Sequence, residues 1–204
     1  MDENVNKSRE EQSRGMKDLL LVVDMQNVYR EGEPWACRNT ETVAGKIEKL
    51  LKSEKADEVI FTVFEAPKNP TGCWKEYSRE YADINADAYQ NALMDIFLPY
   101  KEKYPVYSKS TYSSFSVAKV REAAERADRV VVCGVVAECC ILATVESLID
   151  SGTKVVYLKD AVAGQTEEFE QIVEKIVTSF STMHTEVMTV EEYLADSHKR
   201  GGSV

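Results

Sequence analysis

Histidine is scarce in this chain. Only 2 of the 204 residues are His, and the 5 cysteines form no CxxC pair. Transition-metal sites are built mainly from His and Cys at short, regular spacings. His184 and His198 lie far in sequence from the adjacent pair Cys139 and Cys140. We therefore expect no metal centre and no cofactor.

Positive charge is also in short supply. The chain has 25 Lys and Arg against 35 Asp and Glu, a formal net charge of −10. Nucleic acids and anionic membranes bind surfaces rich in Lys and Arg, and the densest basic run here is the short segment 198–200. We expect neither a nucleic acid nor a membrane as a partner, and a small molecule instead.

Long apolar runs are missing as well. No segment approaches the roughly 20 apolar residues of a membrane span, and residues 1–15 lack the apolar core of a signal peptide. An odd number of irregularly spaced cysteines is typical of free thiols in a reducing compartment. These features predict a cytoplasmic protein. We expect a disordered N-terminal tail over residues 1–16, one domain over 17–196 and a C-terminal tail over 197–204.

What the sequence does contain is an alternation of strand and helix patterns. Short β-branched runs predict strands at 19–23, 59–64, 106–108, 130–132, 155–158 and 186–188. Helical periodicity or capping signals mark segments near 40–51, 93–100, 116–124, 138–149, 167–176 and 190–195. Residues 65–90, rich in Pro, Gly and Tyr, read as a long loop with one helical piece. The alternation predicts an α/β three-layer sandwich with a mostly parallel, doubly wound sheet of about six strands.

Three polar residues fall at or just beyond the carboxyl ends of expected strands: Asp24, Lys109 and Cys140. Open α/β sheets bind ligands at this edge. A thiolate can attack a carbonyl carbon, and a carboxylate can take the thiol proton and return it to a departing amine. A lysine ammonium would hold both groups and lower both pKa values. The three together predict amide hydrolysis through a thioester.

The nucleophile is expected in the first turn of a helix. Backbone N–H groups and the helix dipole favour a thiolate there. Cys139 satisfies the same argument as Cys140, so local reasoning alone leaves both open.

Three motifs resemble those of the isochorismatase-like cysteine hydrolase superfamily, which includes nicotinamidases and N-carbamoylsarcosine amidases. Residues 20–27, Leu-Leu-Val-Val-Asp-Met-Gln-Asn, resemble its D-x-Q opening. Residues 108–115, Ser-Lys-Ser-Thr-Tyr-Ser-Ser-Phe, resemble its K-x-x-Y-S-x-F segment. Residues 134–141, Gly-Val-Val-Ala-Glu-Cys-Cys-Ile, resemble its nucleophile segment G-x-x-T-[DE]-x-C-V. The similarity covers about residues 17–190.

The resemblance implies a role for each residue. Cys140 becomes the nucleophile, Asp24 the proton shuttle and Lys109 the electrostatic support. A cis peptide is implied between Val136 and Ala137, in a turn that offers N–H groups of Val136, Ala137 and Cys140 to the oxyanion. Ala137 stands where threonine is frequent in the family.

The resemblance also bears on the substrate and the assembly. Tyr29, an aromatic residue after D-x-Q, is expected to line the substrate pocket, with Trp35, Trp74 and Tyr112 as weaker candidates. A homo-oligomer is implied, to whose neighbouring pocket residues 65–90 could contribute.

Two departures narrow the chemistry. Nicotinamidases bind a metal through a T-x-D-x-H-P segment, which here reads Thr-Val-Phe-Glu-Ala-Pro over residues 62–67. Phe64 and Ala66 replace the Asp and His, so the resemblance implies no metal and disfavours a nicotinamidase. Isochorismatases proper lack the cysteine, so Cys140 favours cleavage of a C–N bond in a small amide or ureido substrate.

Two alternatives remain open. The first is a catalytically silent protein that binds a ligand or partner through the same pocket, against which the intact set of three residues argues. The second is a redox role for Cys139 and Cys140, which ranks last because adjacent cysteines form only strained disulfides.

Overall fold

The computed structural model describes residues 16–197, so the two expected tails lie outside the described residues apart from Met16 and Ser197. Six strands form one sheet in the order β3-β2-β1-β4-β5-β6, and every neighbouring pair is parallel. The expected doubly wound sheet is thus confirmed. The strands are β1 (Asp18–Val23), β2 (Glu58–Phe64), β3 (Val106–Lys109), β4 (Arg129–Val135), β5 (Val155–Ala163) and β6 (Thr185–Met188).

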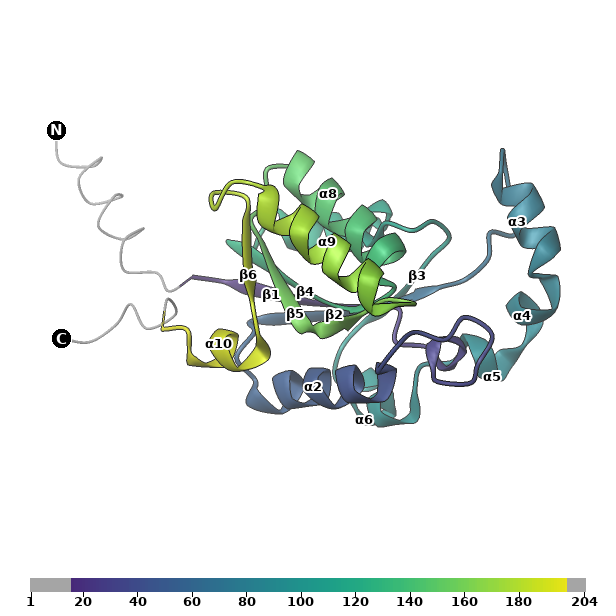
Figure 1. Ribbon diagram of the computed structural model, residues 1–204, viewed down its shortest axis with the longest axis horizontal. Coiled ribbons are helices and arrows are strands. Elements are labelled where there is room, and N and C mark those ends of the chain that lie inside the picture. The colour runs from purple at the N-terminus through teal and green to yellow at the C-terminus, as the bar shows by residue number, and fades with distance from the viewer. Residues whose placement is uncertain (1–15, 198–204) are drawn as a thin grey trace, which may run out of the picture.

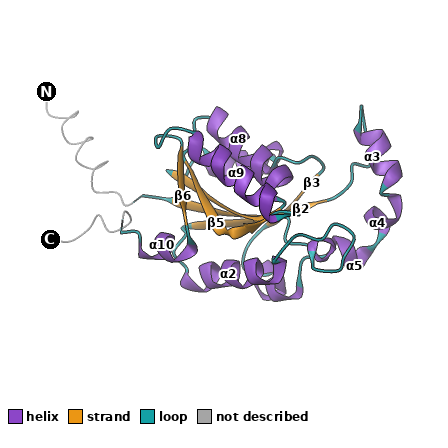
Figure 2. Ribbon diagram, in the orientation of Figure 1, coloured by secondary structure: helices purple, strands orange, loops and turns teal. Residues whose placement is uncertain are grey.

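Helices cover both faces of the sheet, which confirms the three layers (Figures 1 and 2). One face carries α7 (Ala118–Ala124), α8 (Leu142–Asp150) and α9 (Glu167–Ser179), and the other carries α2 (Thr40–Ser53), α6 (Leu98–Lys101) and α10 (Val190–Ala195). Among residues 16–197, no helix combines the length and apolarity that crossing a bilayer requires.

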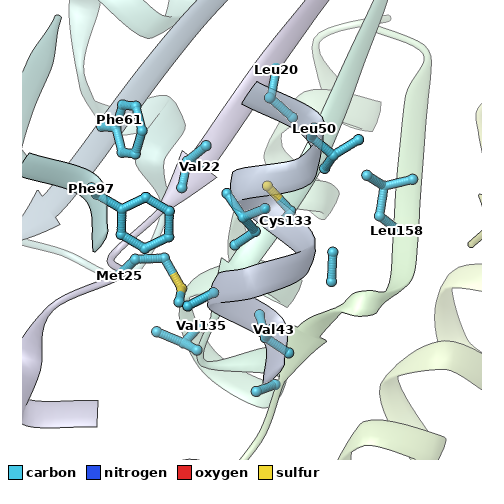
Figure 3. Packing of buried hydrophobic residues seen from close by; sticks show 14 of the residues in the cluster. Leu20, Val22, Met25, Val43, Leu50, Phe61, Phe97, Cys133, Val135 and Leu158 are labelled. Carbon is cyan, nitrogen blue, oxygen red and sulfur yellow. The ribbon is translucent and has the colours of Figure 1, made fainter. Parts of the chain in front are cut away.

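The core divides into two apolar layers because alternate side chains of each strand point to opposite faces. Leu20 and Val22 of β1 pack toward α2, where they meet Val43 and Leu50 (Figure 3). Leu19 and Leu21, on the other side of the same strand, pack toward α7, α8 and α9. The strands are therefore buried on both faces, as their continuous apolar runs indicate.

The segment expected as a long loop is more regular than its composition suggests. It contains α3 (Trp74–Glu80), α4 (Ala82–Ala86) and α5 (Ala88–Asn91), which form an arm at the end of the molecule away from α10 (Figure 1). None of these helices buries a residue fully, so no apolar stripe marks them in the sequence. The segment 93–100, in contrast, is less regular than the helix expected there. It forms a 3₁₀ turn, Asp95–Phe97, followed by the single-turn α6.

Strands β1, β2 and β3 follow one another toward one edge of the sheet, and β4, β5 and β6 toward the other, so the strand order changes direction between β1 and β4. A glycine lies at this point. Gly134 pairs with Val23 and has a φ of +116°. A Cβ at this position would lie 2.1 Å from the carbonyl oxygen of Val23. Only glycine allows β1 and β4 to approach this closely at the point where ligands bind in such sheets.

Candidate active site

The three residues predicted from strand ends meet in space. Lys109 Nζ lies 2.6 Å from Asp24 Oδ2 and 3.3 Å from Cys140 Sγ. All three residues are buried. The site therefore holds a carboxylate, an ammonium and a thiol within hydrogen-bond reach of one another, away from bulk water.

Asp24 is oriented by its backbone and by β2. It follows β1 directly and has a φ of +54°, a left-handed conformation that Asp tolerates better than most residues. Its N–H donates to the carbonyl oxygen of Thr62 at 2.9 Å, and the Thr62 hydroxyl donates to Asp24 Oδ1 at 3.2 Å. The turn thus aims the second carboxylate oxygen, Oδ2, at Lys109.

Lys109 is the last residue of β3, one residue beyond the strand expected from sequence. Its ammonium donates to Cys140 Sγ and to the carbonyl oxygen of Thr111 at 3.0 Å, and it forms an ion pair with Asp24. Burial alone would lower the pKa of this amine, but the negative charge of Asp24 outweighs that effect and raises the pKa above its usual value. The lysine therefore stays protonated and fixed.

Cys140 lies in a π-helical turn, Ala137–Ile141, which precedes α8. The N–H groups of Cys139 and Ile141 both donate to the carbonyl oxygen of Val136, at 3.1 Å each. The carbonyl oxygen of Cys140 accepts from the Thr144 hydroxyl at 2.6 Å. The turn is therefore held on both sides of Cys140.

The expectation of a lowered thiol pKa is wrong for the free protein. Burial, and next the negative charge of Asp24, raise the pKa of Cys140 well above its ordinary value, although Lys109 opposes the shift. The helix N-terminus and one ammonium do not compensate for the loss of water and a carboxylate beside the sulfur. Burial and the Asp24 charge thus favour the neutral thiol over the thiolate.

The cis peptide lies one residue earlier than expected. It joins Val135 and Val136, not Val136 and Ala137. Strand β4 continues to Val135, so the turn begins at Val136. Val136 and Cys140 line the cavity above the site, whereas Ala137 is buried and does not.

A cavity of about 180 Å³ opens onto Cys140. Tyr29, Trp35 and Tyr112, all candidates from the sequence, line it. Trp74 does not, but its ring lies 5.2 Å from that of Tyr112. The remaining wall residues are Tyr77, Tyr81, Val136, Cys139 and Gln165.

Tyr77 and Tyr81 were not singled out from the sequence. They come from the arm, which thus lines the cavity of its own chain. Gln26, the glutamine of D-x-Q, helps to hold the arm: its side-chain amide donates to the carbonyl oxygens of Phe64 and Asn91. Asn27 similarly donates to the carbonyl oxygen of Tyr89 at 3.0 Å. The density of tyrosines in residues 65–90 was the available signal.

Metal-binding side chains do not gather in the part of the chain that the structure describes, where no group of three or more His, Cys, Asp or Glu is placed to hold an ion. Phe64, at the aspartate position of the nicotinamidase segment, is buried with its ring 5.5 Å from Lys109 Nζ. The five cysteines are all free, and Cys139 is half-buried beside Cys140.

Known proteins share this fold. A family model described as Isochorismatase domain matches residues 18–192. No curated protein matches the sequence. A cysteine hydrolase from Pseudomonas syringae pv. phaseolicola 1448A superposes with a TM-score of 0.76 at 22% identity, covering 88% of this chain and 91% of that one.

Two further solved structures have similar scores. An isochorismatase family protein from Desulfovibrio vulgaris gives a TM-score of 0.73 at 18% identity, with 87% and 96% of the two chains covered. A nicotinamidase/pyrazinamidase from Bacillus subtilis gives 0.70 at 18% identity, with 85% and 100% covered. At these identities the solved structures support the fold alone.

Proposed function

Because the chain belongs to the isochorismatase family, we propose that it is a metal-independent cysteine hydrolase that cleaves the C–N bond of a small amide or ureido substrate. The observation that carries the proposal is the placement of Lys109 Nζ between Asp24 and Cys140, 2.6 Å from the carboxylate and 3.3 Å from the sulfur. The sulfur lies at the floor of a cavity large enough for a small planar molecule.

The first half-reaction forms a thioester. Asp24 takes the thiol proton while Cys140 Sγ attacks the carbonyl carbon, which becomes tetrahedral. Asp24 then returns the proton to the leaving nitrogen, and the C–N bond breaks. The amine leaves, and the acyl group stays on the sulfur.

The second half-reaction uses water. Asp24 takes a proton from the water that attacks the thioester carbon, and the C–S bond breaks. The proton returns to the sulfur, which regenerates the neutral thiol and releases the acid. A resting thiol with a raised pKa fits this cycle, because a base within reach removes the proton only as the S–C bond forms.

Lys109 stabilises the negative charge that passes between the sulfur and the carboxylate. The oxyanion of the tetrahedral intermediate needs separate donors. We assign this role to the backbone N–H groups of Val136 and Cys140, because both residues line the cavity. Ala137, the third candidate from the sequence, is buried away from the cavity wall.

Tyr29 is proposed as a substrate-binding residue. It is buried, and it lines the cavity together with Cys140. Its ring lies 6.0 Å from that of Trp35, so the two form an apolar wall. Such a wall suits the planar face of a carboxamide or ureido group.

The test is ammonia release from a panel of small carboxamides and ureido compounds, with intact-protein mass measured during turnover. We expect Cys140→Ala to lower kcat by about 10⁴-fold or more. Cys139→Ala is the matched variant, and we expect its kcat to stay within about threefold of the natural protein, since Lys109 donates to Cys140. A mass increase equal to the acyl group, present in the natural protein and absent in Cys140→Ala, would identify the thioester.

Two results would contradict the proposal. Equal activity of Cys140→Ala and the natural protein would show that the reaction does not pass through a thioester on Cys140. Ligand binding without turnover of any amide would support the silent binding protein instead.

A homo-oligomer also stays a prediction, which light scattering would contradict by showing particles with the mass of one chain.

A further inference from the structure

A second cavity adjoins the one above Cys140. Its volume is about 490 Å³, and we call it the outer cavity; the cavity at Cys140 is the inner cavity. Tyr77, Tyr81 and Tyr112 line both. The two cavities are therefore neighbours that share three tyrosine side chains, and the proposal below has one substrate occupy both.

Aromatic rings dominate the outer wall. The rings of Trp74 and Tyr112 lie 5.2 Å apart, those of Trp74 and Tyr77 also 5.2 Å, and those of Tyr77 and Tyr81 4.8 Å. Trp35 contacts the same group through Tyr81, at 5.5 Å. The chain has 2 tryptophans in all, and both belong to this group.

The charges at these walls have one sign. Among the described lining residues of the two cavities, the ionisable side chains that are charged at neutral pH are Glu76 and Glu80, and none is Lys or Arg. Glu76 has an exposed contact with Arg79 at 3.4 Å. Lys109 lies below the inner cavity, where Asp24 balances its charge. An anionic substituent would meet carboxylates here, whereas a cation is attracted to them.

We propose that the outer cavity binds an alkylated ammonium group of the substrate, while the inner cavity holds the amide carbonyl against Cys140. This inference rests on the proposed function and adds the charge of the substrate to it. Faces of Trp and Tyr rings attract cations, and a quaternary ammonium needs no hydrogen-bond acceptor from the wall. Glu76 and Glu80 add long-range attraction at the rim.

The first test measures binding without chemistry. Choline and its uncharged isostere 3,3-dimethylbutan-1-ol are titrated calorimetrically into Cys140→Ala protein, with tryptophan fluorescence as a second readout. We expect choline to bind about 5- to 30-fold more tightly. Trp74→Leu should remove most of this difference, and Glu80→Gln should weaken choline binding about threefold, less so at high salt.

Matched controls lie on the same arm. Asp83→Asn removes one negative charge from α4, and Tyr89→Leu removes an exposed ring from α5; neither residue lines the inner or the outer cavity. Both should leave choline affinity unchanged. Equal binding of the two probes, or equal losses in Trp74→Leu and Tyr89→Leu, would overturn the cation site.

The second test separates this inference from the proposed function. The natural protein is given trimethylammonio-acetamide and its uncharged isostere 3,3-dimethylbutanamide. We expect kcat/KM to favour the cationic amide by at least fivefold and Trp74→Leu to abolish the preference. Cleavage of both amides at equal kcat/KM would overturn the cation site and leave the hydrolase standing. Selective binding of choline with no cleavage of any amide would support the cation site and overturn the proposed hydrolase.

Discussion

The two ends of the sheet both bury charged side chains: Asp18 and Arg129 at one end, Asp24 and Lys109 at the other. Asp18 and Arg129 face each other at the start of β1 and β4. Asp24 and Cys140 follow the ends of these strands. The comparison shows which buried charges indicate a reactive site and which only hold elements together.

The amino-terminal cluster is closed. Arg129 donates to both carboxylate oxygens of Asp18 at 3.0 Å, to Asp196 at 2.9 Å and to Glu186 at 3.2 Å. The Tyr193 hydroxyl donates to Asp18 Oδ2 at 2.9 Å. One cation is thus surrounded by acceptors from β1, β6 and the end of α10. Every contact ties one element to another.

The carboxyl-terminal cluster leaves one member open. Lys109 and Asp24 form an ion pair, whereas Cys140 lines a cavity and has a thiol pKa that burial raises. Burial and pairing are common to both ends, so neither feature alone identifies a catalytic site. What distinguishes the second cluster is a cysteine that contacts the charged pair and also lines a cavity, as the proposed nucleophile must.

The largest difference between the ends should appear when one carboxylate at each is neutralised. Asp24→Asn removes the proposed base and should lower kcat by about 10²- to 10⁴-fold. Asp18→Asn should leave kcat per folded molecule within about threefold, because Asp18 lies at the far end of β1. Kinetics on samples whose folded fraction is measured by circular dichroism would decide. A similar loss of kcat in both variants would contradict the division of roles.

At the amino-terminal cluster we expect the loss of a charge to lower the stability of the protein and not its kcat. Arg129→Met leaves three carboxylates without their shared cation and should lower the free energy of unfolding by about 3–5 kcal/mol. The kcat per folded molecule should not change. Arg126→Met is the matched control, since Arg126 pairs with Glu58 on the surface and its loss should cost about 0–1 kcal/mol. Urea unfolding measures both, and equal costs would show that the amino-terminal cluster contributes no more than a surface pair.

A smaller effect follows from removing one hydroxyl at each end. Tyr193→Phe removes the donor to Asp18 and should cost about 1.5–3 kcal/mol of stability with kcat unchanged. Thr62→Val removes the donor to Asp24 Oδ1, at 3.2 Å, and should act chiefly on kcat, by roughly 3- to 10-fold for about 1 kcal/mol. Thermal unfolding and kinetics on both variants test the pair. If Tyr193→Phe and Thr62→Val lost the same stability and had the same kcat, the two hydroxyl groups would not have the different roles predicted here.

The sequence allowed prediction of the sheet and of the proximity of the three site residues for a common reason. Buried strands appear as β-branched runs, and parallel strands bring residues at their carboxyl ends to one edge. Asp24, Lys109 and Cys140 could therefore be placed together without coordinates. Sequence reasoning did not find Arg129 as a structural centre, because its partners Glu186 and Asp196 are brought to it only by β6 and α10.

Three features could not be predicted from the local sequence pattern, because they depend on contacts between distant segments or on burial. The arm helices α3–α5 bury no residue fully, so no periodicity marked them. The register of the cis peptide was wrong by one residue, because β4 extends to Val135. The direction of the Cys140 pKa shift was wrong because burial, which the helix position does not reveal, outweighs the attraction of Lys109.

The last prediction concerns the charges around Cys140 directly, and it is read from the reactivity of the thiols toward iodoacetamide. The alkylation rate follows the thiolate fraction. A raised pKa leaves less thiolate at neutral pH and burial hinders access, so Cys140 should label more slowly at neutral pH than the exposed Cys73, and its labelling should speed up as the pH rises. Asp24→Asn removes a charge that raises this pKa and should speed labelling of Cys140, on the order of tenfold per pKa unit.

The same variant should thus label faster and hydrolyse more slowly, whereas Lys109→Met should slow both reactions. Peptide mass spectrometry across pH 6 to 10 separates Cys140 from Cys139 and the other thiols. Labelling of Cys140 that is fastest near pH 6 in the natural protein would mean that Lys109 dominates the field at the sulfur. Asp24 would then have no proton to remove, and its role as the base would have to be abandoned even if Cys140 remained the nucleophile.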